Sequence, residues 1–202
     1  RGVPPEAIRQ FCEMIGVAKT NSVVDWGKFD YALRDTLNTT AERVMAVLDP
    51  LVLKLTNVEN DVVIEADLWP HDVPGEGTRS LTISNEVLIE RSDFEENPPK
   101  GWRRLAPGTE VRLRHGWVVR CDEVIKDADG TVVELKCTHE PTSKSGAKAP
   151  SELAGNGKIK GIIHWLSAAA AVPASVRLYD RLFSEAQPGA SHDDGDFLRD
   201  LN

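Results

Sequence analysis

The stretch NPPKGWRRLAPGTEVRLRHGWVVR, residues 97–120, combines a strand-like pattern with a dense cluster of positive charge. Its one acidic residue is Glu110, and its basic residues are Lys100, Arg103, Arg104, Arg112, Arg114 and Arg120. The chain as a whole carries a formal net charge of -8. A local reversal of charge in an acidic protein favours a binding site for a polyanion over a generally adhesive surface.

Residues 110–114 alternate between apolar and charged side chains, which is the period of a half-buried strand. Val111 and Leu113 are expected to face a core, while Arg112 and Arg114 project from the other face and could grip phosphates or base edges. The alternative is a solvated face whose arginines pair with Asp or Glu across the sheet. Trp102, beside Arg103 and Arg104, favours a site for unpaired bases, because aromatic rings and arginines stack on them.

Composition describes a globular chain of 202 residues, 41% hydrophobic and 28% charged, enough for one large or two small domains. No apolar run approaches membrane length, and residues 1–5 lack the order of a signal peptide. Three widely spaced cysteines predict a reducing compartment with no disulfide framework. Cys121, Cys137 and His139 lack the fourth ligand and the spacing of a zinc site, so we expect the cysteines to lie in a β core.

The first forty residues predict a helical hairpin. Pro4 and Pro5 suit the first turn of a helix that Gly16 ends. Asp25 is the predicted N-cap of a second helix. One face of that helix carries Trp26, Phe29, Leu33 and Leu37.

Short strands separated by turns dominate the rest of the chain. They are predicted at residues 51–55, 61–66, 81–84, 86–90, 112–121, 123–126, 131–138, 158–165 and 176–183. The Asp129-Gly130 pair predicts a hairpin turn, and residues 69–78 and 140–157 predict loops. His164, between apolar neighbours, is expected in a barrel wall. The fold class is therefore α+β, with a small N-terminal helical subdomain followed by one or two mainly antiparallel β-barrels.

Motifs of catalysis are missing from this sequence. It contains no G-x-S-x-G, P-loop, G-x-G-x-x-G or H-E-x-x-H pattern. From its residues alone, the chain is predicted to be a binding module and not a catalyst.

Several segments, in order and from end to end, resemble the C-terminal half of class I glutaminyl-tRNA synthetases, which belong to the glutamyl/glutaminyl group. They are RGVPPEAIRQFCEMIGV (1–17), LNTTAERVMAVLDPL (37–51), GTRSLTISNEVLIERSDF (77–94), WRRLAPGTEVRLRHGWVV (102–119) and KIKGIIHWLSAAAAVPASVRLYDRLF (158–183). The resemblance implies a stem-contact helical subdomain at residues 1–38. It also implies an anticodon-binding β-barrel region at residues 39–202, with a loop at about 140–157.

The resemblance also implies which residues contact the anticodon. By position they are Asn38, Arg43, Arg103, Arg104, Arg112 and Arg114, to which the stacking argument adds Trp102. The family often has a glutamine where Gly101 stands, and glycine has no side chain to replace that contact. The acidic remainder is expected to repel misplaced RNA, so charge reversal at Glu42 or Asp93 should not weaken binding.

For the parent protein, the resemblance implies a ligase that joins glutamine to its tRNA with ATP and Mg²⁺. Its catalytic domain is expected upstream of Arg1, and further barrel strands are expected after Asn202. No catalytic residue, cofactor or metal is expected on the present segment. The expected partners are the anticodon and inner stem of glutamine tRNA and the upstream catalytic domain, in a cytoplasmic monomer without a membrane.

Three alternatives stay open at this stage. The chain could be the same region of a related glutamyl-tRNA synthetase, which would charge a different tRNA. It could be an RNA-binding β-barrel with no enzyme attached, such as one that binds ribosomal RNA. It could also be a plain protein-interaction barrel, which predicts no RNA affinity and no salt dependence.

Overall fold

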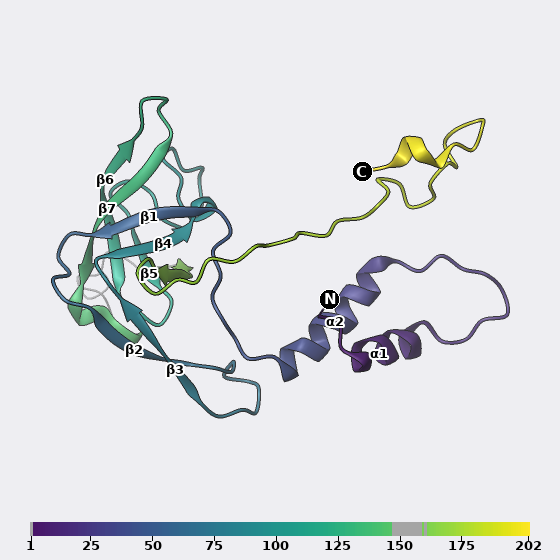
Figure 1. Cartoon of the computed structure of the whole chain (residues 1–202), viewed down its shortest axis with the longest axis horizontal. Coiled ribbons are helices and arrows are strands. Elements are labelled where there is room, and N and C mark those ends of the chain that lie inside the picture. Colours follow the sequence, from purple (N-terminus) through teal and green to yellow (C-terminus); the bar gives the residue numbers. More distant parts are fainter. Residues whose placement is uncertain (1, 147–158, 160) are drawn as a thin grey trace. The chain divides into compact units, whose positions relative to one another are not determined.

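The computed structural model describes residues 2–146, 159 and 161–202. The chain divides into two compact units, Arg1–Ala171 and Val172–Asn202. The first unit holds both α-helices and every regular strand of the described residues (Figure 1).

The predicted helical hairpin is confirmed. Helix α1 spans Pro5–Ile15 and ends at Gly16, which has φ 67° and donates its N–H to Cys12 O at 3.1 Å. Helix α2 spans Trp26–Thr40, and Asp25 caps it by accepting a hydrogen bond from Gly27 N at 2.6 Å. The two helices pack through an edge-to-face contact between Phe11 and Phe29, whose ring centres are 5.3 Å apart.

Seven strands form one curved sheet in the order β8-β5-β6-β7-β1-β4-β9. Their bounds are β1 Pro50–Leu55, β4 Glu86–Glu90, β5 Glu110–Leu113, β6 Val118–Lys126, β7 Val132–Glu140, β8 Ile162–Ile163 and β9 Trp165–Ser167. Among the strand pairs of the described residues, β1–β7 and β5–β8 are parallel and the others are antiparallel. Strands β2 (Val62–Asp67) and β3 (Thr78–Ile83) form a separate antiparallel ribbon. The predicted α+β class, with a mainly antiparallel sheet, is confirmed.

The two edge strands of the sheet are neighbours in sequence. Strand β8 pairs with β5, strand β9 pairs with β4, and His164 alone separates β8 from β9. A sheet whose opposite edges are joined by one residue must curl until those edges meet, so it forms a nearly closed barrel. His164 lies in this seam between the buried side chains of Ile163 and Trp165, as a barrel-wall histidine should.

Alternating apolar residues of the strands fill the barrel. The core contains Leu51, Leu53, Leu55, Ile83, Val87, Ile89, Val111, Leu113, Leu135 and Trp165. Cys121 and Cys137 are free thiols that face each other across β6 and β7, and both are fully buried. The expected core role of these cysteines is confirmed, and no cluster of metal-ligating side chains occurs among the described residues.

The structure corrects three strand predictions. In its described part, the single strand expected at residues 158–165 is divided at His164 into β8 and β9, which pair with different neighbours. The strand expected at residues 112–121 is broken by a tight turn at His115 and Gly116, where Gly116 N donates to Leu113 O at 2.8 Å. The strand expected at residues 176–183 is wrong: these residues are all described and form no strand, and the β-bridge that they contribute is an isolated one between Phe183 and Leu201. A strand needs a hydrogen-bonded neighbour along its length, and an alternating sequence does not by itself provide one.

The second unit is organised around the buried side chain of Asp200, in the 3₁₀ helix η3 (Phe197–Asp200). Asp200 accepts hydrogen bonds from Gly189 N at 2.7 Å and pairs with His192 Nε2 at 2.9 Å. These contacts lower the pKa of the Asp200 carboxyl, the backbone hydrogen bond contributing most.

Most of the loop predicted at residues 140–157 lies outside the described residues. Its beginning holds the end of β7 and the 3₁₀ helix η2 (Pro141–Gly146). In the described part of the chain, no helix is both long and apolar enough to span a membrane.

Candidate functional site

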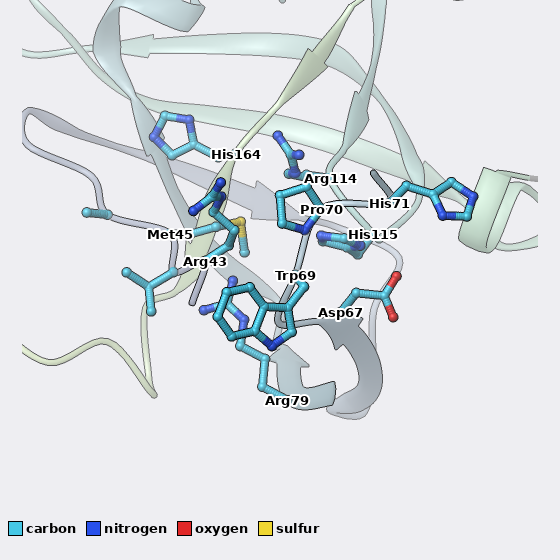
Figure 2. Close-up of a pocket in the computed structure, with 12 residues that line it drawn as sticks. Arg43, Met45, Asp67, Trp69, Pro70, His71, Arg79, Arg114, His115 and His164 are labelled. Atoms are coloured by element: carbon cyan, nitrogen blue, oxygen red, sulfur yellow. The ribbon is translucent and has the colours of Figure 1, made fainter. Parts of the chain in front are cut away.

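A pocket of about 650 Å³ opens beside the barrel seam, and five separate segments of the first unit line it (Figure 2). Its lining residues are Arg43, Val44, Met45, Ala46, Asp67, Trp69, Pro70, His71, Arg79, Arg114, His115 and His164. The lining includes three arginines and three histidines but one carboxylate, that of Asp67. The pocket is therefore electropositive in an acidic chain, which suits an anionic ligand.

Arg114 is held in place by the barrel seam. Its backbone N donates to Ile163 O at 2.9 Å, and its backbone O accepts from Trp165 Nε1 at 2.9 Å. These partners flank His164, so both sides of the seam fix the start of the Arg114 side chain. A rigid backbone lets a guanidinium recognise a ligand at low entropic cost.

Arg43 joins the end of helix α2 to the pocket. Its Nη1 donates to Ala41 O at 2.7 Å, and its Nη2 donates to Asn38 O and Asn38 Oδ1, both at 3.1 Å. Its backbone N donates to Leu68 O at 2.8 Å. Arg43 thus satisfies carbonyl groups at the helix C-terminus, where positive charge is favourable. Asn38 orients the guanidinium, so two predicted site residues lie together.

Trp69 supplies the aromatic wall of the pocket. A Cβ built on Gly75 would lie 2.4 Å from the Trp69 ring, so the loop after Trp69 folds directly onto that ring. Only glycine permits this approach. An indole fixed by such packing beside arginines is a suitable platform for a base.

Arg79 lines the same pocket and carries a buried hydrogen-bond donor. Its Nε is buried and has no hydrogen-bond partner among the described residues. Buried donors without partners are rare in folded proteins. The buried Nε therefore costs the fold free energy, and any contact of Arg79 with a ligand would fall to its terminal nitrogens.

His115 contributes a neutral ring to the pocket at physiological pH. Burial lowers its pKa, and the neighbouring positive charge of Arg114 lowers it further. His115 also has φ 63°, the left-handed conformation that histidine tolerates better than most residues. Neutral imidazole can both donate and accept a hydrogen bond, which suits a base edge.

We expect the free energy of unfolding to fall as the pH drops from about 7 towards 5. Burial lowers the pKa of His115 and of His139, whose ring packs on Trp117. As the pH falls below about 6.5, the ordinary pKa of histidine, the two histidines of the unfolded chain take up protons before those of the folded chain do. The stability that the two neutral histidines contribute is fully present above a pH of about 6.5 and is lost as the pH falls through their lower pKa values in the folded chain.

Urea unfolding of the wild type and of a His115→Asn/His139→Gln variant at pH 7.5, 6.5 and 5.5 measures this contribution. The variant should show the flatter dependence on pH. Equal slopes in the two proteins would contradict the role of these histidines.

The other predicted site residues lie away from the pocket. Trp102 is half-buried and donates its Nε1–H to Leu105 O at 3.0 Å, so its ring is partly committed to the loop. Arg112 donates to Ser143 O at 2.5 Å, which ties β5 to the segment after β7. Arg103 is exposed. Of Arg112 and Arg114, only Arg114 lines this pocket.

Arg104 forms a salt bridge with Asp93, and this contact corrects the expectation for Asp93. The sequence predicted that charge reversal at Asp93 would not weaken RNA binding. The Asp93 side chain is only 4% exposed and belongs to the 3₁₀ helix η1 (Arg91–Asp93). Asp93 is therefore unsuitable as a neutral control.

Sequence reasoning missed Trp69, His71, Arg79 and His115 as pocket residues, and it assigned His164 only to the barrel wall. Trp69 and His71 lie in a segment that its prolines and glycines marked only as a loop. The pairing of an aromatic residue with a returning glycine, Trp69 with Gly75, was a usable signal for an ordered loop.

Models of known families match two parts of the chain. Residues 41–140 match the description "tRNA synthetases class I (E and Q), anti-codon binding domain", and residues 162–202 match a second model with the same description. Fold, pocket and match together define a nucleic-acid-binding domain. The chain belongs to the family of anticodon-binding domains of class I tRNA synthetases of the E and Q group.

Similar proteins carry a more particular name. The chain is 49% identical to a glutamine–tRNA ligase of Nitrobacter hamburgensis, 48% to one of Bradyrhizobium diazoefficiens and 46% to one of Pseudomonas aeruginosa. Each alignment covers 100% of this chain. The chain spans 35% of the length of each relative.

Proposed function

We propose that this chain is the tRNA-binding, anticodon-reading part of a glutamine–tRNA ligase. The observation that carries the proposal is the pocket lined by Arg43, Arg79, Arg114 and Trp69 in a chain of net charge -8. Bases that are unstacked from a loop are recognised by aromatic stacking and by arginine donors on their edges. The names of the relatives support glutamine as the amino acid of the parent enzyme.

The candidate residues fall into two groups under this proposal. Asn38, Arg43 and Arg114 serve the pocket, where Arg43 and Arg114 bind one unpaired nucleotide and Trp69 stacks on its base. Trp102, Arg103, Arg104 and Arg112 serve the surface around the 97–104 loop. Separate positions suit an anticodon, whose three bases must be splayed apart to be read singly.

The parent enzyme would ligate glutamine to its tRNA with ATP and Mg²⁺ in the cytoplasm, as a monomer. Residues 1–38 would contact the inner stem of the tRNA, and residues 39–202 would form the anticodon-binding region. The amphipathic hairpin of α1 and α2 suits a role as a rigid support for RNA beside the barrel, and its exposed Arg9 and Arg34 could meet phosphates.

Binding of the 202-residue chain to glutamine tRNA, and to a variant with an altered anticodon, tests the proposal across a salt series. We expect binding that prefers the cognate anticodon and weakens with salt. For a single strand, the logarithm of the binding constant should fall by about 0.7 per tenfold rise in salt for each phosphate that the protein neutralises. Arg114→Ala should reduce the preference. Arg120→Ala is the matched control, because Arg120 pairs with Asp122 at 2.8 Å outside the pocket.

Other outcomes point to the alternatives. Salt-dependent binding with no anticodon preference would indicate phosphate docking only. A preference for glutamate tRNA would indicate the glutamyl relative of the same family. Absence of RNA binding together with a failure of the full-length protein to charge glutamine tRNA would refute the proposal.

A further inference from the structure

Asp93 is a buried carboxylate that the pocket does not use. Its Oδ1 accepts a hydrogen bond from Arg104 Nη1. Its Oδ2 is buried and has no hydrogen-bond partner among the described residues. A buried, half-satisfied carboxylate is costly to the fold, which raises the question of what it contributes.

The same short segment fixes the backbone next to Arg104. Asp93 O accepts a hydrogen bond from Leu105 N at 3.0 Å, and Leu105 O accepts one from Glu95 N at 3.1 Å. The side chain of Arg104 is nevertheless 52% exposed. Asp93 thus holds the Arg104 guanidinium at one nitrogen and holds the following peptide, while part of the guanidinium still faces solvent.

We propose that Asp93 is a positioning residue that orients Arg104, so that the outward donors of its guanidinium read a base edge of bound tRNA. This inference rests on the proposed function. An arginine on a flexible side chain loses rotamer entropy when it binds, and a fixed partner removes much of that loss before the ligand arrives. A small rotation of the Arg104 guanidinium would let a second of its N–H groups donate to Asp93 Oδ2, so that both carboxylate oxygens hold it.

The opposite charges of Asp93 and Arg104 favour base reading over phosphate binding. Asp93 offsets the positive charge of Arg104, so the pair attracts phosphates weakly and contributes mainly directional hydrogen bonds. Burial raises the pKa of the Asp93 carboxyl, and nearby Glu90 adds to this, while Arg104 and His164 oppose it. Ionised Asp93 is therefore kept at a cost to stability, as functional groups often are.

Asp93→Asn in the 202-residue chain separates positioning from a structural role. The asparagine preserves the shape but removes the charge, so Arg104 becomes a mobile, uncompensated cation. We expect discrimination between cognate and altered anticodons to fall about tenfold, the scale of one good base contact. Affinity for the altered tRNA should stay equal or rise. The slope of the logarithm of the binding constant against the logarithm of the salt concentration should steepen by up to about 0.7, because one more cation can contact a phosphate. The Tm should not fall.

Asp122→Asn is the matched control. It also frees an arginine, Arg120, from a carboxylate 2.8 Å away and changes the net charge equally. It should steepen the salt dependence without changing discrimination. In an Arg104→Ala background, Asp93→Asn should have no further effect on discrimination, because both variants remove the same oriented donor.

Several outcomes would overturn the inference. Unchanged discrimination in Asp93→Asn, or additive losses in the double variant, would mean that Asp93 does not act through Arg104. If Asp93→Asn unfolds, Arg104→Lys replaces it: lysine keeps the charge and a donor to Asp93 but lacks the planar fork, and retained discrimination would then count against positioning. A wild type that binds no tRNA would instead overturn the proposed function, and this inference with it.

Discussion

Replacing Arg43 by alanine is expected to weaken the binding of cognate tRNA by about 1–3 kcal/mol, or about 5- to 150-fold, which is the range for a two-point base contact. Arg43 lines the pocket while its guanidinium is already oriented by Asn38 and by Ala41 O. The variant loses a pocket donor and also uncaps carbonyl groups at the end of α2. Equilibrium binding to cognate and anticodon-altered tRNA measures the effect, and the difference between these tRNAs should shrink.

Two further variants separate the roles of Arg43. Arg43→Lys keeps the positive charge near the helix end but cannot make the same fork of hydrogen bonds, so it should keep stability better than it keeps discrimination. Arg104→Ala should weaken the binding of cognate tRNA by a similar amount, about 1–3 kcal/mol, through the surface around the 97–104 loop. If Arg43→Ala and Arg104→Ala both keep full discrimination, the assignment of these residues to the anticodon is wrong.

Gly161→Ala is expected to destabilise the first unit by about 2–4 kcal/mol, at or above the upper end of the overpacking range. A Cβ at Gly161 would lie 1.8 Å from Arg103 O and 2.9 Å from Val111 Cγ2. Gly161 O also accepts the hydrogen bond of Arg112 N at 3.0 Å. The methyl group must therefore push the backbone of Arg103 away from β5, which should also weaken tRNA discrimination.

Thermal unfolding measures this loss, and a decrease in Tm of about 4–16 °C corresponds to it for a domain of this size. Gly130→Ala is the matched control, because its Cβ would meet open space and only its φ of 82° opposes a side chain. That variant should cost about 1 kcal/mol and leave discrimination unchanged, since Gly130 lies in the β6–β7 turn. Equal losses in the two variants would mean that the contact with Arg103 does not limit the packing.

The elements that the sequence predicted correctly are those whose signals are local. Asp25 and Gly16 act on the helix beside them, so their effects could be read without knowing the fold. The alternation around Val111 and the Asp129-Gly130 turn likewise describe contacts with the next few residues or the next strand. The order of these local patterns along the chain predicted a helical subdomain followed by a β-barrel, and the family resemblance added the expected roles of the two parts.

The pocket could not be predicted in the same way, because it depends on contacts between distant segments. Nothing near Arg79 in sequence indicates that its Nε becomes a buried, unpartnered donor. Asp93 looked like one more surface acid, since charge alone does not reveal burial. Residues 176–183 alternate as a strand should, but alternation does not provide the neighbouring strand that a sheet requires.

The one-residue connection between β8 and β9 also affects how the chain folds. The barrel cannot close before Trp165–Ser167 exists, because these residues pair with β4 while β8 pairs with β5. Pairing between such distant segments is slow, typically milliseconds to seconds for β-rich domains. A ribosome adds about 5–20 residues per second. The edge of β4, which ends at Glu90, therefore waits about 4–15 s for the synthesis of β9, and the edge of β5, which ends at Leu113, waits about 3–10 s for that of β8. During that wait their unpaired edges are the surfaces that a chaperone would have to shield from aggregation.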